Sequence, residues 1–114
     1  MRISFTARHF KATKRLKEYS EKKVYRLKKY YDGIIDCEII LDYEKLNQIA
    51  EIAIKVYGQR LVAIEKSADI FKSIDLAVEK LERQVKKYKE KLRSYSNEKA
   101  TTIVPPSSLE QEEL

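Results

Sequence analysis

The chain has 114 residues, with 24 Lys and Arg against 18 Asp and Glu, and its formal net charge is +6. This length is enough for one domain with a substantial core and too short for two ordinary domains. Its single cysteine excludes an internal disulfide framework, and no stretch approaches the ~20 apolar residues that span a bilayer. The N-terminus also lacks the apolar run of a secretory signal. We therefore expect a soluble cytoplasmic protein with no membrane partner.

The sequence begins with an alternating stretch, and a basic helix follows it. Residues 2–8 alternate apolar and polar side chains, which is typical of a half-buried strand. Residues 12–31 repeat apolar side chains at helical spacing. Thr13 is suited to cap the N-terminus of this helix, and Asp32 and Gly33 are suited to end it.

Three further strands are predicted in the middle of the chain, with short turns between them. Residues 34–42, 47–58 and 59–67 each alternate apolar and polar side chains. The connection between the first two is short enough for a hairpin, and Gly58 marks a second tight turn. Cys37 falls in the inward alternation of its strand, so we interpret it as a small buried residue and not as a reactive thiol.

A long helix and a tail complete the chain. The helix begins after Ser67 or Asp69, either of which can cap it, and runs without Gly or Pro to about Arg93. The order β-α-β-β-β-α predicts an α+β sandwich, in which two helices pack on one face of a four-stranded, mostly antiparallel sheet. Residues 1–95 form this domain. Residues 96–114 contain a Pro pair, a Ser pair and an acidic end, and we expect them to form a flexible tail.

The positive charge is concentrated in the two helical segments. Residues 12–31 hold eight cations against two acids (+6), and residues 69–93 hold eight against five (+3). The intervening residues 34–67 hold four cations against six acids (−2). A domain with this bias is suited to a polyanion, and nucleic acid is the commonest one in the cytoplasm.

On the last helix the cations gather instead of alternating with acids. At about 100° per residue, four of them share an arc that contains no acid of the same helix. If this were an ordinary solvated face, we would expect charges of both signs and oppositely charged pairs at i,i+4, a pattern that Glu79 and Arg83 do fit. The first helix has a comparable flank, and Lys23 borders its apolar stripe. If the helices pack side by side, the two flanks can form one continuous basic surface. The arc on the last helix consists of Lys80, Arg83, Lys87 and Lys91.

Other chemistry finds little support in the sequence. His9 has no obvious acid or thiol partner by spacing, and one His with one Cys cannot form a zinc site. Two glycines provide no phosphate-cradling loop. We therefore expect no catalytic residue, no metal, no cofactor and no small-molecule substrate. Tyr25 points away from the apolar stripe and Tyr57 lies near a turn, so either is a candidate for base stacking, although nothing in the sequence selects them.

Residues 68–92, ADIFKSIDLAVEKLERQVKKYKEKL, and the strand IAEIAIKVYG resemble the ribosome hibernation promoting factor and ribosome-associated inhibitor family in its short, sigma-54 modulation protein-like form. The resemblance implies a β-α-β-β-β-α fold and a non-enzymatic protein that is monomeric away from the ribosome. It also implies binding in the mRNA and tRNA channel of the small ribosomal subunit, which blocks translation in stationary phase or stress. The rRNA-binding positions that it implies are Lys22, Lys23, Arg26, Lys29, Lys80, Arg83, Lys87 and Lys91. A protein–protein adaptor and a general double-stranded RNA-binding module remain alternatives.

Overall fold

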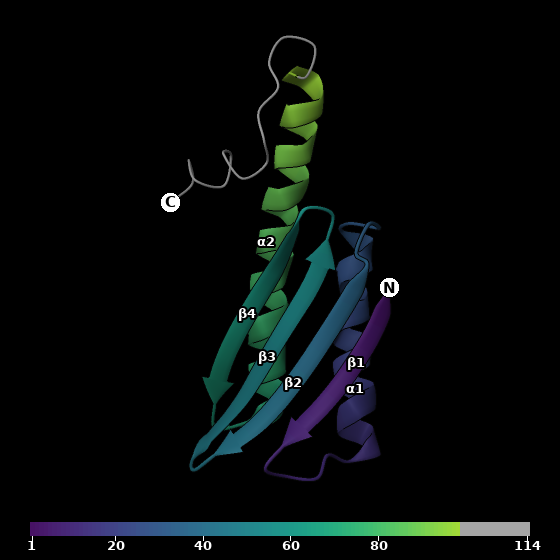
Figure 1. Ribbon diagram of the computed structural model, residues 1–114. Coiled ribbons are helices and arrows are strands. Elements are labelled where there is room, and N and C mark those ends of the chain that lie inside the picture. The colour runs from purple at the N-terminus through teal and green to yellow at the C-terminus, as the bar shows by residue number, and fades with distance from the viewer. Residues whose placement is uncertain (99–114) are drawn as a thin grey trace.

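The computed structural model describes residues 1–98, and the order of its elements confirms the sequence prediction. The first helical segment divides into an α-helix and a short 3₁₀ helix, η1. In chain order the elements are β1 (Arg2–Arg8), α1 (Lys14–Tyr25), η1 (Arg26–Lys29), β2 (Asp36–Glu44), β3 (Asn47–Val56), β4 (Gln59–Ser67) and α2 (Ile70–Glu98) (Figure 1).

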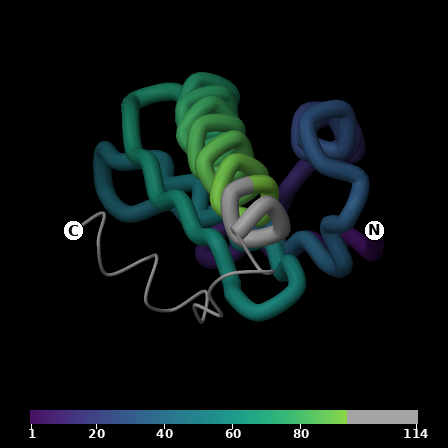
Figure 2. The backbone as a smooth tube through the Cα atoms, turned by 90° about the horizontal axis from the view of Figure 1, so that it is seen from above, coloured from purple at the N-terminus to yellow at the C-terminus, as the bar shows by residue number. Residues whose placement is uncertain are grey.

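The four strands form one mixed sheet in the order β1-β2-β3-β4. β1 and β2 are parallel, because the chain crosses over through α1 between them, and the other two pairs are antiparallel hairpins. α2 then returns across β3 and β4. Both helices lie on the same face of the sheet and beside each other, as the two views in Figures 1 and 2 show. The predicted α+β sandwich is confirmed.

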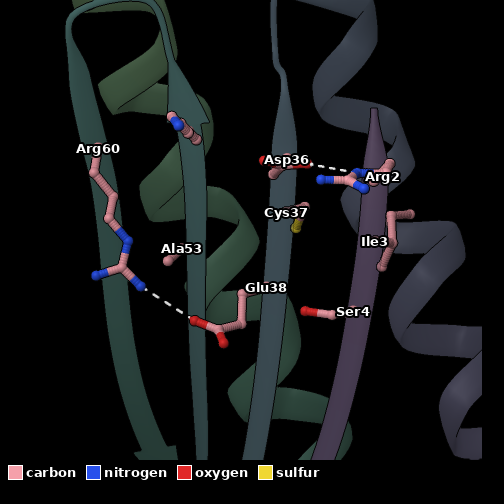
Figure 3. A pocket seen from close by; sticks show the side chains of 9 residues that line it. Arg2, Ile3, Ser4, Asp36, Cys37, Glu38, Ala53 and Arg60 are labelled. Atoms are coloured by element: carbon pink, nitrogen blue, oxygen red, sulfur yellow. Dashed lines mark hydrogen bonds and ion pairs between the residues drawn. The ribbon is translucent and has the colours of Figure 1, made fainter.

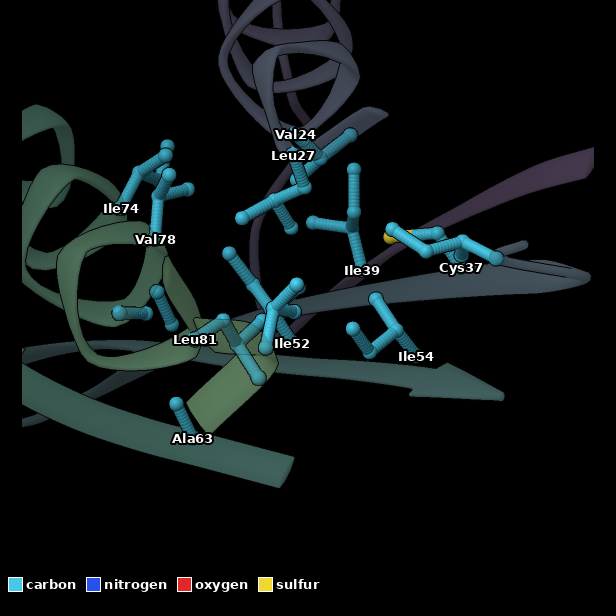
Figure 4. Packing of buried hydrophobic residues seen from close by; sticks show 14 of the residues in the cluster. Val24, Leu27, Cys37, Ile39, Ile52, Ile54, Ala63, Ile74, Val78 and Leu81 are labelled. Atoms are coloured by element: carbon cyan, nitrogen blue, oxygen red, sulfur yellow. The ribbon is translucent and has the colours of Figure 1, made fainter. Parts of the chain in front are cut away.

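Alternating side chains explain why one face of the sheet carries the core. Ile39, Leu41, Ile52 and Ile54 point toward the helices and are fully buried, while alternate residues such as Glu38 and Glu51 face the other side. From the helical layer, residues such as Leu81 close onto them (Figure 4). Cys37 belongs to the same cluster, which confirms that it is a buried core residue.

Capping residues determine where the two helices begin, whereas packing determines where the first helical segment changes its geometry. Thr13 caps α1, since its hydroxyl accepts a hydrogen bond from the Leu16 amide at 3.1 Å. At α2 the cap is Asp69, whose carboxylate accepts from the Phe71 amide at 2.9 Å. The prediction of one helix over 12–31 was wrong at its end, because the chain tightens into η1 as Leu27 becomes fully buried.

The last helix is longer than the sequence predicts. α2 continues to Glu98 instead of ending near Arg93, since no Gly or Pro interrupts residues 93–98. The predicted domain boundary at residues 95 and 96 therefore falls inside α2. The remaining part of the predicted tail, residues 99–114, lies outside the described residues. Within residues 1–98, no helix is both long and apolar enough to cross a membrane.

Candidate nucleic-acid interface

Three predicted cations lie exposed along α1 and η1. The side of this segment that packs on the sheet is marked by Leu16, Val24 and Leu27, all of them buried. Lys22, Arg26 and Lys29 are exposed, and their positions in the helical repeat place them away from that buried side. Throughout residues 1–98, no carboxylate lies within 4.0 Å of these three cations. We call Lys22, Arg26 and Lys29 the α1 group.

Lys23, in contrast, lies in the contact between the two helices. Its Nζ is 3.4 Å from Oδ1 of Asp75 on α2, and its side chain is only 27% exposed. The Tyr19 hydroxyl donates to the same carboxylate oxygen at 2.6 Å, and the Lys23 ammonium lies 5.5 Å from the centre of the Tyr19 ring. Burial and the Asp75 hydrogen bond together raise the pKa of Tyr19 to about 12. Lys23 therefore helps to hold α1 against α2, a role that the helical periodicity of its own segment did not reveal.

The four cations that share an arc on α2, the α2 ladder, lie on the flank nearest β4. Gln84 lies in the same arc, and its Nε2 donates to the Val62 carbonyl of β4 at 3.1 Å. Lys80 Nζ is 3.6 Å from Oε2 of Glu65, also on β4. The sequence placed no acid of α2 on this arc, but the neighbouring strand supplies one. Arg83 and Lys87 are exposed and Lys91 is partly buried.

The two basic groups are separated along the helical layer and do not merge into one surface. Asp75 faces α1 through Lys23, and Lys86 faces Tyr30, which follows η1 and whose ring centre is 4.9 Å from the Lys86 ammonium. Glu79 and Glu82 fall between these positions in the same helical repeat, so the flank of α2 that faces α1 is mixed in charge. The expected continuous surface is thus divided into the α1 group and the α2 ladder.

The opposite face of the sheet carries paired charges. A hollow there is lined by residues of all four strands and contains two ion pairs, each 3.2 Å long: Arg2 with Asp36, and Arg60 with Glu38 (Figure 3). Its cations are therefore largely compensated by adjacent carboxylates. Of the two faces, the helical one presents the more uncompensated positive charge, and it is the better candidate for an anionic partner.

The residues considered for other chemistry are accounted for by local structure. Burial raises the pKa of Cys37 to about 12, which keeps the thiol protonated at neutral pH. His9 does have an acid partner, contrary to the sequence interpretation, because parallel pairing places Asp42 beside the end of β1. His9 Nδ1 and Asp42 Oδ1 are 2.7 Å apart on an exposed surface. Among residues 1–98 there is no cluster of three metal-ligating side chains.

The fold and the exposed cations of the helical layer define a small α+β domain with a basic face. The family described as "Sigma 54 modulation protein / S30EA ribosomal protein" matches residues 3–93, and the chain belongs to this family. A protein from Pseudomonas putida named ribosome hibernation promoting factor is 33% identical over 94 residues, covering 82% of this chain and 92% of that protein. Its namesake from Escherichia coli K12 is 28% identical over 95 residues, covering 83% and 100%.

Solved structures agree with this assignment. A ribosomal subunit interface protein from Coxiella burnetii superposes with a TM-score of 0.75 at 34% identity, covering 79% of this chain and 99% of that one. The N-terminal domain of Protein Y from Thermus thermophilus gives a TM-score of 0.72 at 34% identity, covering 77% and 99%. The family resemblance and the fold expected from it are confirmed.

Proposed function

We propose that this protein is a ribosome hibernation factor. It binds the small ribosomal subunit in the mRNA and tRNA channel and blocks translation in the cytoplasm in stationary phase or stress. Membership in the family and the names of the relatives support the ribosome as partner. The observation that carries the proposal in this molecule is the exposed basic side of its helical layer, opposite a sheet face on which Arg2 and Arg60 are paired with carboxylates.

The mechanism is inhibition by occupancy. Lys80 and Lys91 are 11 residues apart, or ~16 Å along a helix, so the α2 ladder can contact several rRNA phosphates. Each neutralised phosphate releases counterions, which makes binding strongly salt-dependent. The position of the folded rRNA defines the target, so backbone and shape contacts suffice and base readout is not required. No bond is made or broken, and the protein acts as a monomer through residues 1–95.

The eight proposed rRNA-binding residues differ in how freely they can reach a phosphate. Lys23 already contacts the Asp75 carboxylate, and Lys80 contacts that of Glu65, so the charge of each lysine is partly compensated before RNA binds. Arg26 and Arg83 are exposed and carry the planar guanidinium that forms bidentate contacts with phosphate. We therefore assign the largest contributions to the arginines. The full proposed set is Lys22, Lys23, Arg26, Lys29, Lys80, Arg83, Lys87 and Lys91.

Co-sedimentation with small ribosomal subunits tests the proposal. The double variant Arg83→Glu and Lys87→Glu is expected to lose co-sedimentation while its melting temperature stays within a few degrees of wild type, since surface substitutions usually change stability by less than ~0.5 kcal/mol. The control Lys55→Glu and Lys66→Glu makes the same charge change at exposed positions on the opposite sheet face. Retained binding by the first variant, or equal loss by both, would refute the assignment of the site.

Nuclease treatment separates this function from the alternatives. Partner capture from a lysate is expected to disappear when ribosomes are digested, because rRNA forms the binding surface. Capture that survives digestion would instead identify a protein–protein adaptor. Binding to isolated duplex RNA as tight as binding to small subunits would identify a general double-stranded RNA-binding module.

A further inference from the structure

A second hollow lies on the helical side of the molecule, where α1 passes into η1 beside the start of β1. Its volume is about 560 Å³, which is room enough for a nucleotide. It contains both an apolar part and a charged rim, and the α1 group belongs to that rim. The residues that line it are Met1, Ile3, Glu21, Lys22, Tyr25, Arg26 and Lys29.

Tyr25 is the aromatic wall of this hollow. It is 54% exposed, so part of the ring is accessible to a ligand. The Lys28 ammonium lies 5.3 Å from the centre of the ring, which directs the positive charge of Lys28 toward one ring face. Met1 and Ile3, which pack against the core, supply apolar surface beside the ring. A flat apolar ligand can therefore stack on Tyr25 and cover this surface.

The charges around the ring identify the rest of the ligand. Lys22, Arg26 and Lys29 present three cations, and no carboxylate among residues 1–98 lies within 4.0 Å of any of them. Glu21 also lines the hollow, and its negative charge opposes a bare phosphate on its side. A ligand with a neutral ring at Tyr25 and negative charge at the cations satisfies both conditions. A nucleotide has this combination.

We propose that the Tyr25 hollow, formed by these seven lining residues, binds one unpaired nucleotide of an RNA strand by stacking its base on Tyr25. The inference rests on the proposed function and deepens it, because it adds a base contact to a surface otherwise described by phosphate contacts. A base within a duplex has both faces covered by its neighbours, so the target is a nucleotide in a loop, bulge or single strand. The α1 group then holds the phosphates on either side of the stacked base.

Three variants separate stacking from charge. Tyr25→Ala is expected to weaken binding to small subunits by at least ~5-fold, the lower end of the effect of removing a base-stacking aromatic. Tyr25→Phe keeps the ring and is expected to bind like wild type. Tyr57→Ala removes another highly exposed tyrosine, 80% exposed in the β3–β4 turn, and is expected to have no effect. Unchanged affinity of Tyr25→Ala, or equal losses in Tyr25→Phe or Tyr57→Ala, would overturn the proposal.

Short oligonucleotides identify the source of the nucleotide. The Tyr25→Ala change is expected to lower affinity for a single-stranded A10 probe by ~5-fold or more and to leave affinity for the A10·U10 duplex within ~2-fold. An equal loss on the duplex would overturn the assignment to an unpaired base. AMP is expected to compete only weakly, because it offers one phosphate group. If AMP binds as tightly as A10, the hollow is a site for a free nucleotide and the proposal of a strand fails.

The failure of this inference is distinguishable from failure of the proposed function. If wild-type protein does not co-sediment with small subunits, the proposed function itself fails. If wild-type protein binds and Tyr25→Ala binds equally well, only the stacking contact fails. Because Tyr25 is exposed, its removal is not expected to unfold the domain, and a thermal melt of each variant verifies this.

Discussion

Replacing Glu65 with Gln is expected to strengthen binding to the small ribosomal subunit, because Glu65 compensates part of the α2 ladder. Its Oε2 lies 3.6 Å from Lys80 Nζ, and the two side chains are 29% and 48% exposed. A phosphate in contact with Lys80 would lie roughly 6 Å from this carboxylate, where two unit charges in water repel by about 0.7 kcal/mol. Removing the repulsion lowers Kd by about threefold at low salt and by less as screening increases.

The measurement is a titration of labelled protein with small subunits, followed by fluorescence anisotropy at low and at physiological salt. Glu38→Gln is the matched control, because it makes the same charge change next to Arg60 on the opposite sheet face. Stability is expected to change little, since partly exposed ion pairs contribute at most about 1 kcal/mol. No gain for Glu65→Gln, or the same gain for Glu38→Gln, would refute the placement of phosphate at Lys80.

Three further predictions concern the fold that holds the site. Burial raises the pKa values of Tyr88 and Cys37 to about 12, and that of Tyr19 likewise, so the folded state favours their neutral forms. Their contribution to stability is complete below the unfolded pKa values and is lost as the pH approaches 12. Denaturation followed by circular dichroism should therefore give a free energy of unfolding that is constant near neutral pH and falls in alkali. A free energy of unfolding that stays constant up to pH 12 would contradict this. Leu81→Ala, at a fully buried position, should cost about 3 kcal/mol and lower the melting temperature by more than ~10 °C, and a smaller shift would mean that the core relaxes around it. Asp75→Asn removes the ion pair across the helices and should lower stability by about 1 kcal/mol in urea denaturation, whereas no change would exclude a stabilising role for this contact.

The order of the elements was predictable because each leaves a local signal. Period-two alternation placed β1 and β4 at their observed bounds, and Thr13 was identified as a cap from its residue type and position. The end of α1 was not predictable in the same way. The conversion to η1 accompanies the burial of Leu27 against the rest of the core, and a single helix contains no information about that packing.

The positions of the cations on each helix were predictable, but their contacts with other elements were not. Helical periodicity placed the four cations of the α2 ladder on one arc, because that arc depends only on spacing along one helix. Glu65 and Asp75 reach Lys80 and Lys23 from other elements, so their effects depend on tertiary packing. His9 and Asp42 are a similar case, since their contact follows from the parallel register of β1 and β2. Contacts between side chains of different elements could therefore be identified only from the three-dimensional structure.

In the proposed function the helical face, and not the sheet face, contacts the small subunit. Lysine acylation of the bound protein, read by mass spectrometry and compared with the free protein, tests it without any substitution. On the subunit, Lys22, Lys29 and Lys87 are expected to lose most of their reactivity, while Lys55 and Lys66 on the opposite sheet face keep theirs. Protection of Lys55 and Lys66 with full reactivity of the helical lysines would show that the sheet face makes the contact instead.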